Sequence, residues 1–107
     1  MKHALVTGGS GGIGAAICRR LAADGCHVLI HAHRGADAAH ALADDITAQG
    51  GSAQVLVFDV TDPAAVADVL NPLLEQTPIQ ILVNNAGIHD DAVFPGMRAE
   101  QDRKSVV

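Results

Sequence analysis

The stretch Thr7-Gly8-Gly9-Ser10-Gly11-Gly12-Ile13-Gly14 contains five glycines in eight residues. The apolar run Ala4–Val6 before it predicts a short buried strand, and Ile13, Ile17 and Leu21 recur at the spacing of one helix face. Positions without side chains let the backbone turn sharply and approach a phosphate closely, and the start of a helix supplies a positive dipole end. The stretch therefore predicts a strand, a phosphate-binding loop and a helix, although a plain glycine-rich turn has the same composition.

The alternation of strand and helix continues along the chain. Residues 27–32 form a second apolar run, and residues 37–49 have helical spacing up to the glycine pair 50–51. Residues 55–58 and 80–83 are two further apolar runs of strand length. We therefore expect the element string β-α-β-α-β-α-β.

A third helix is expected between the last two strands. Asp62 is a favourable N-cap residue, and Pro63 fits the first helical position, where no amide donor is needed. Pro72 lies inside the helix, where we expect it to remove one backbone hydrogen bond and to bend the last turn. The apolar stripe that we expect to face the core consists of Val66, Val69, Leu70, Leu73 and Leu74.

The apolar strands indicate the fold class. Strands that are apolar throughout have no solvent side, so they predict a parallel sheet covered by helices on both faces. With right-handed crossovers the strand order is 3-2-1-4, which is part of a doubly wound α/β sheet of the Rossmann type. One domain over residues 1–101 accounts for the pattern.

Composition excludes several classes of partner. The chain has 107 residues with 12 acidic and 7 basic side chains, for a formal net charge of −5. No cluster of Lys and Arg exceeds the pair 19–20, so no nucleic-acid partner is predicted. No apolar run approaches the roughly 20 residues that cross a bilayer, and the first residues lack the features of a signal peptide. We expect a cytoplasmic protein without a membrane partner.

The cysteines and histidines do not predict a metal site. Cys18 and Cys26 do not form a Cys-x-x-Cys pair, so we interpret them as reduced packing residues. His31 and His33 would share one face of the second strand, but no carboxylate or thiol accompanies them at ligand spacing.

The glycine loop can be read in two ways. One is G-x-G-x-x-G from Gly9, Gly11 and Gly14, and the other is T-G-x-x-x-G-x-G over residues 7–14. No Lys-Ser or Lys-Thr follows the glycines, which excludes a Walker A loop for nucleoside triphosphates. Because the loop joins a strand to a helix in a β-α-β unit, both readings predict a dinucleotide ligand.

The residues after the second strand bear on which dinucleotide is bound. An NAD-preferring site places an acidic residue there, roughly 20 residues beyond the last glycine, on the ribose hydroxyls. This sequence has His33 and Arg34 instead. A guanidinium suits a 2′-phosphate, so the pair favours NADP(H) over NAD(H) as the cofactor. The alternative is that Arg34 is only a solvated residue in a turn.

Three motifs in order carry a family resemblance. They are the loop at 7–14, Asp59-Val60 after the third strand, and residues 84–87 (Asn-Asn-Ala-Gly) after the fourth. On these motifs the chain resembles the short-chain dehydrogenases/reductases over about residues 2–101. Residues 84–88, Asp90 and residues 94–97 are most similar to those of the bacterial 3-oxoacyl-acyl-carrier-protein reductases.

The resemblance implies a set of dinucleotide contacts. These are Gly8, Ser10, Gly11, Gly12, Ile13 and Gly14 for the pyrophosphate and nearby ribose, Asp59 and Val60 for the adenine, and Asn85, Ala86 and Gly87 for the nicotinamide-side ribose. Asp59 has a rival interpretation as a loop residue before the third helix, and Asn84 one as a bracket to a neighbouring strand. The family often carries a basic residue where this sequence has Gly11, a departure that weakens the case for NADP(H).

By the same resemblance, catalysis transfers a hydride from the nicotinamide to a carbonyl carbon. A Tyr whose pKa is lowered by a nearby Lys donates the proton, and a Ser orients the carbonyl. The chain contains no Tyr, and Lys2 and Lys104 are its only Lys residues. We therefore expect the front part of a reductase of 3-oxoacyl thioesters that is inactive by itself and has no catalytic residue.

The last six residues depart from the pattern. Residues 102–107 abandon the apolar periodicity where the family begins its next helix, and they are similar to what a widely used sequencing adapter encodes. We expect a non-native tail, the alternative being a genuine short terminus.

Other functions fit the same residues. The front half of an acetoacetyl-CoA reductase or of another family member would look alike, and a freestanding, non-catalytic nucleotide-binding module also needs no Tyr. The resemblance implies a homotetramer and an acyl-thioester substrate for the full-length parent protein only.

Overall fold

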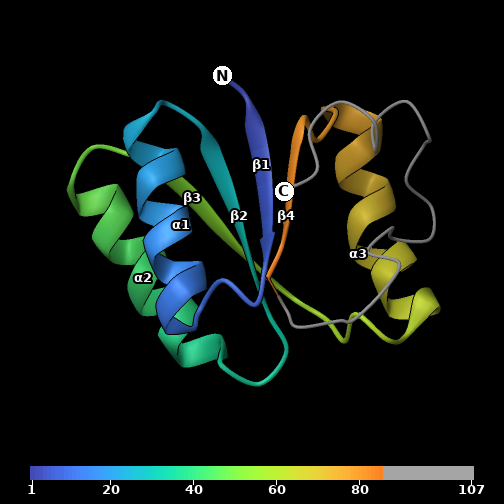
Figure 1. Cartoon of the computed structure of the whole chain (residues 1–107). Coiled ribbons are helices and arrows are strands. Elements are labelled where there is room, and N and C mark those ends of the chain that lie inside the picture. Colours follow the sequence, from blue (N-terminus) through green and yellow to red (C-terminus); the bar gives the residue numbers. More distant parts are fainter. Residues whose placement is uncertain (86–107) are drawn as a thin grey trace.

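The computed structural model describes residues 1–85, which form a sheet with helices on both of its faces (Figure 1). The elements, in chain order, are β1 (His3–Thr7), α1 (Gly12–Ala23), β2 (His27–Ala32), α2 (Ala36–Ala48), β3 (Ser52–Val57), α3 (Pro63–Gln76) and β4 (Ile81–Asn84). This is the expected β-α-β-α-β-α-β string.

The sheet has four parallel strands in the order β3-β2-β1-β4. In the centre, Leu5 of β1 is paired with Leu29 of β2 and with Leu82 of β4. The doubly wound fold of the Rossmann type and the strand order 3-2-1-4 are thus confirmed. Since the chain adds β2 and β3 on one side of β1 and then returns to add β4 on the other, a switch point lies between β1 and β4.

Alternate residues of each strand serve two separate cores. Leu5, Leu29 and Leu82 pack with Val66 and Leu70 of α3 on one face. On the other face, the neighbouring residues of the same strands pack under α1 and α2, and the buried members of that core are Ala4, Val6, Cys18, Cys26, Val28, Ile30, Ala32, Ala39, Leu42, Ile46 and Val83. Both faces are apolar because both are covered, as Figure 1 shows with α1 and α2 on one side and α3 on the other.

The ends of α3 follow local sequence signals. The Asp62 carboxylate accepts hydrogen bonds from the amides of Ala64 and Ala65, at 3.1 and 3.3 Å, which confirms the predicted N-cap. Pro63 occupies the first turn, and the helix continues past Pro72 to Gln76. A proline that close to the end of a helix does not terminate it.

Two elements differ from the expectations. β3 begins at Ser52 and ends at Val57, whereas its apolar run covers residues 55–58. The strand is longer at its start because Ser52, Ala53 and Gln54 pair with residues 27–29 of β2, whatever their own hydrophobicity. β4, expected over residues 80–83, is shifted by one residue and covers Ile81–Asn84.

The helix face of α1 is only partly covered. Ile17 and Leu21 pack against the core, but Ile13 is 74% exposed. With Ala16 and Val83 these residues line an apolar groove of about 610 Å³ beside β4. The spacing of apolar residues predicted the helix correctly, but it did not distinguish the covered turns from the uncovered one.

Both cysteines are free and buried, as predicted. Burial raises the pKa of the Cys18 thiol to about 12, so this thiol is unreactive near neutral pH. Within residues 1–85 no helix is long and apolar enough to cross a membrane, and no group of His, Cys, Asp and Glu has the arrangement of a metal site.

Candidate dinucleotide site at the carboxyl edge of the sheet

The predicted site residues that the structure describes lie at one edge of the sheet. The glycine loop follows β1, His33 and Arg34 follow β2, Asp59 and Val60 come after β3, and Asn85 follows β4. Parallel strands end at the same edge, and the crevice outside their carboxyl ends is where open α/β sheets bind ligands. Ala86 and Gly87 lie outside the described residues, as does the tail 102–107.

Two backbone amides of the glycine loop donate hydrogen bonds to His31 of β2. Gly8 has a φ of 63°, a conformation that side chains disfavour. Its amide donates to Nδ1 of His31 at 3.0 Å, and the amide of Gly9 donates to the His31 carbonyl oxygen at 3.0 Å. The first two amides of the loop therefore face into the protein.

The amides that follow have a different role. Gly11 is the N-cap of α1 and contributes no side-chain cap. The first amides of a helix have no partner within the helix, so those of Gly12, Ile13 and Gly14 are available to an acceptor that approaches from solvent. The arrangement suits an anion at the positive end of the helix dipole.

Gly14 is required by the packing of this turn. A Cβ at this position would lie 2.3 Å from the Gly8 carbonyl oxygen, 2.7 Å from Nδ2 of Asn85 and 2.9 Å from Cα of Gly9. Two of these neighbours are backbone atoms that cannot move without distorting the loop. Only glycine lets the first turn of α1 pack against the loop and the end of β4.

Gly12 is in the opposite situation. A Cβ built on Gly12 would meet no atom within 4 Å, so the described residues set no requirement for glycine there. Gly12 is also exposed, as is Ile13 beside it. Space at the start of α1 that residues 1–85 do not fill is what a closely bound ligand needs.

The end of β4 is joined to the glycine loop by Thr7. The Thr7 hydroxyl, fully buried, donates to Oδ1 of Asn84 at 2.9 Å and accepts from the amide of Asn85 at 2.9 Å. Nδ2 of Asn85 donates to the Gly8 carbonyl oxygen at 3.2 Å. Asn84 is thus a bracket to the neighbouring strand, which is the rival interpretation that the sequence left open. Among residues 1–85, no donor bonds the side-chain oxygen of Asn85.

Asp59 lies in the turn between β3 and α3. Its Oδ1 accepts from the amide of Thr61 at 2.9 Å and from the Thr61 hydroxyl at 2.7 Å. The hydroxyl bond, followed by the amide bond, lowers the pKa of the Asp59 carboxyl, and His33 and Arg34 act in the same direction. Asp59 is therefore an ionised loop residue whose Oδ2 has no partner within residues 1–85, so both of its interpretations are compatible with this geometry.

The turn after β2 lies against the glycine loop. His33 and Arg34 are both exposed. A Cβ built on Gly35 would lie 2.6 Å from Oγ of Ser10, so the two loops touch there. Arg34 therefore directly precedes the residue at which the two loops touch. The prediction that His31 and His33 share a strand face is wrong, because β2 ends at Ala32 and His33 lies beyond it.

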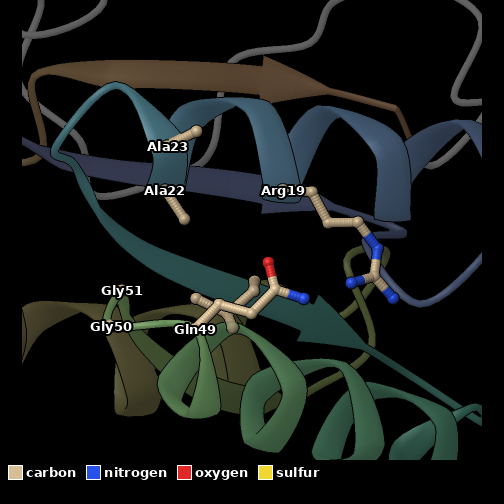
Figure 2. A pocket seen from close by; sticks show the side chains of 7 residues that line it. Arg19, Ala22, Ala23, Gln49, Gly50 and Gly51 are labelled. Carbon is tan, nitrogen blue, oxygen red and sulfur yellow. The ribbon is translucent and has the colours of Figure 1, made fainter.

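A second hollow lies between α1 and α2, away from this edge (Figure 2). It has a volume of about 240 Å³, and its lining includes Arg19, Gln49 and the glycine pair 50–51. Arg19 is paired with Asp45. The hollow is next to the C-terminal ends of both helices, where the dipole disfavours anions, so it does not fit a diphosphate.

Sequence reasoning missed the role of two side chains at the site. The sequence identifies Thr7 only as the first residue of the glycine motif. It identifies His31 only as a candidate metal ligand that has no second ligand at the required spacing. Both are buried polar residues at the end of an apolar strand, at 0% and 2% exposure. A polar residue in such a position needs a hydrogen-bond partner, which is the signal that could have identified them.

Comparison with known proteins agrees with this geometry. The family model described as short chain dehydrogenase matches residues 2–107. The acetoacetyl-CoA reductase of Allochromatium vinosum is 45% identical over 98 residues, which are 90% of this chain and 40% of that protein. The 3-oxoacyl-[acyl-carrier-protein] reductase FabG of Escherichia coli is 43% identical over 101 residues, 94% of this chain and 40% of that protein.

Solved structures show the same likeness. A short chain dehydrogenase from Burkholderia cenocepacia, solved in complex with NADP, is 42% identical with a TM-score of 0.73, over 94% of this chain and 41% of that one. The chain spans about two fifths of the length of the curated relatives it matches.

The contrast between Gly14 and Gly12 leads to a stability prediction. We expect Gly14→Ala to lower the free energy of unfolding by about 1–3 kcal/mol, as overpacking does, because its methyl group meets the Gly8 carbonyl. Gly12→Ala is the matched control and should leave stability unchanged or slightly raised, since alanine favours a helix. Urea unfolding followed by circular dichroism measures both. Equal stabilities of the two variants would contradict the packing that we describe.

Proposed function

The chain belongs to the short-chain dehydrogenase family, and from this premise we propose that it is the dinucleotide-binding front part of an NADPH-dependent reductase of 3-oxoacyl thioesters. The observation that carries the proposal is the geometry at the start of α1. The amides of the first turn lack helix partners, residues 1–85 leave the space beside Gly12 empty, and the helix packs so closely on the loop that Gly14 has no room for a side chain. Nucleotide diphosphates are bound in this way, by backbone approach at a helix N-terminus.

The surrounding residues have the chemistry to bind the rest of a dinucleotide. Oδ1 of Asn85 would accept from a ribose hydroxyl on the nicotinamide side. The residues that would hold the diphosphate and the nearby ribose are Gly8, Ser10, Gly11, Gly12, Ile13 and Gly14. Oδ2 of Asp59 would accept from the exocyclic amine of the adenine, with Val60 beside the ring. Ala86 and Gly87, which the family resemblance assigns to the same ribose as Asn85, stay a proposal from the sequence.

We infer a preference for NADPH from the turn after β2. Arg34 is exposed, lies next to a loop that touches Ser10, and offers a planar fork of donors that suits a phosphate. No acidic side chain occupies residues 33–35 to bind the hydroxyls of a 2′-unsubstituted ribose. The NADP complex of the Burkholderia relative supports the same cofactor.

Bound NADPH would supply the hydride for reduction of a ketone, while this chain's residues bind and orient the cofactor. The relatives FabG and acetoacetyl-CoA reductase are both named for 3-oxoacyl thioester substrates, which supports this substrate class. None of the 107 residues is a Tyr, so the proton donor that the family resemblance implies is not among them. We therefore propose that this chain alone binds the cofactor without catalysing reduction.

A non-catalytic nucleotide-binding module is the second candidate. The lack of Tyr favours it equally. Against it, β4 pairs only with β1 among the described strands, and an unpaired apolar strand edge promotes aggregation.

Gly12→Ala tests where the diphosphate lies. We expect the variant to fold as well as the wild type but to bind NADPH at least about tenfold more weakly, because the methyl group enters the space that we assign to the ligand. Titration of the 107-residue chain with NADPH, followed by the amide resonances in NMR spectra, measures both affinity and location. Undiminished affinity in Gly12→Ala would show that the diphosphate does not approach this position.

Arg34→Ala tests the cofactor preference. We expect NADPH affinity to fall roughly ten- to hundredfold, as for the loss of a charged hydrogen bond, and NADH affinity to change little. Arg20→Ala removes the same charge from the last turn of α1, away from the site, and should change neither affinity. Equal weakening of both cofactors in Arg34→Ala would refute a contact with the 2′-phosphate.

The proposed reaction is tested by the gene. We expect the genomic sequence downstream of codon 101 to encode, in frame, a Ser and a Tyr-x-x-x-Lys motif, and the resulting protein to oxidise NADPH with a 3-oxoacyl thioester. Spectrophotometric assay of NADPH at saturating acetoacetyl thioester would measure this activity. A stop codon after Val107 in the genome would favour the non-catalytic module.

A further inference from the structure

His31 connects three segments of the site through one imidazole ring. The side chain is 2% exposed, near the end of β2. Nδ1 lies 3.0 Å from the amide nitrogen of Gly8, and Nε2 lies 2.7 Å from the carbonyl oxygen of Phe58. The ring also packs against the Phe58 ring, with centroids 4.3 Å apart. No other described side chain bonds both the glycine loop and the end of β3.

The partners of His31 determine where its proton is. A backbone amide can only donate, so Nδ1 must accept from Gly8 and carries no hydrogen. A carbonyl can only accept, so Nε2 must donate to Phe58. The ring is therefore neutral, in the Nε2–H tautomer. Both hydrogen bonds are made only by that form.

The bonds of His31 reach residues that we assign to the dinucleotide. Gly8 begins the loop that would hold the diphosphate, and the backbone oxygen of His31 accepts from the next amide, that of Gly9. On the other side, Phe58 directly precedes Asp59 and Val60, which we assign to the adenine. The imidazole thus connects the two segments that we assign to the diphosphate and to the adenine.

We propose that His31 is a positioning residue for the dinucleotide: its imidazole, oriented by Phe58, accepts from the Gly8 amide and so sets the glycine loop in its binding geometry, and it does so only while the ring is neutral. The inference rests on the proposed dinucleotide function. It assigns no contact between His31 and the ligand, since the side chain is buried behind the loop.

Protonation would disrupt this arrangement. An added proton on Nδ1 would face the Gly8 N–H, so one donor would oppose another and the loop would lose its support. Burial lowers the pKa of His31, and nearby His33 acts in the same direction, whereas the Phe58 carbonyl and Asp59 raise it. Within residues 1–85, His33 and Asp59 are the titratable groups that act on the ring. Because the net direction is downward, His31 is neutral at pH 7 and protonation occurs only below the usual value of 6.5.

The sign of the pH effect follows from this linkage. The competent protein has a neutral His31, so binding is unaffected above the ordinary imidazole pKa and weakens as the pH falls through the lowered value. Below that value, affinity should fall by about tenfold per pH unit, because each unit makes the neutral form tenfold rarer.

Two substitutions separate hydrogen bonding from packing. His31→Leu fills similar space but has no acceptor for the Gly8 amide, so NADPH should bind about tenfold more weakly than to the wild type. His31→Asn places its side-chain oxygen close to the position of Nδ1, so it can accept from Gly8 without a titrating ring. We expect His31→Asn to retain affinity within about threefold of the wild type at neutral pH. His40→Leu and His40→Asn are the matched controls on the exposed surface of α2 and should behave as wild type.

The measurement is the Kd of NADPH for the 107-residue chain and its variants, from NMR titrations between about pH 5 and 8. Any pH effect of the 2′-phosphate is common to all variants, so the ratio of the wild-type Kd to that of His31→Asn isolates the effect of His31. We expect this ratio to be constant at neutral pH and to rise as the pH falls. A long-range ¹H–¹⁵N spectrum of the histidine rings reports the tautomer of His31 without any ligand.

The outcomes distinguish this inference from the proposed function. If the wild type binds NADPH and both the Leu variant and the pH ratio are unchanged, His31 does not position the site and the inference is overturned, while the proposed function stands. If His31→Asn is as weak as His31→Leu, acceptance from Gly8 is not what matters, which also overturns it. If the wild type binds no dinucleotide, the proposed function fails, whatever the tautomer. Should the Leu variant not fold, the pH ratio and the tautomer decide.

Discussion

The close approach of α1 to the glycine loop is the constraint on which the rest of the site depends. A methyl group on Gly14 would lie 2.3 Å from the Gly8 carbonyl oxygen and 2.7 Å from Nδ2 of Asn85. The start of the helix, the end of β1 and the end of β4 therefore form one closely packed unit. This unit lies at the carboxyl edge of the sheet, at the switch point between β1 and β4, the place where open α/β sheets bind ligands.

Polar side chains around this unit serve two purposes, and the buried side chains serve a different one from the exposed side chains. Thr7 and His31 are buried and use their polar atoms on neighbouring strands and on the loop, so their role is to hold the protein's own backbone. Arg34 is exposed, and Asp59 keeps one carboxylate oxygen without a partner among residues 1–85. The first group shapes the edge of the sheet, and the second has the chemistry to recognise what is bound there.

Much of the fold could be predicted because its signals are local. The Asp62 cap and Pro63 identify the start of α3 from a few adjacent residues, and the apolar runs 27–32 and 80–83 locate two strands closely. β3 was harder to delimit. Its first half has no large apolar side chain, and it is a strand because β2 lies beside it with backbone groups to pair. Pairing of that kind is not encoded in the segment itself.

The sequence by itself determined the order of the elements, the parallel sheet and the glycine loop, because periodicity and loop composition are properties of neighbouring residues. Only the tertiary structure decided which polar side chains face the loop. His31 and His33 are two residues apart and chemically identical, yet one is buried and bonded to Gly8 and the other is exposed. The difference arises because β2 ends at Ala32, and because the glycine loop, 23 residues earlier in the chain, donates a hydrogen bond to the His31 ring. Contacts between segments so far apart depend on how the strands are placed side by side, which the local pattern of residues does not specify.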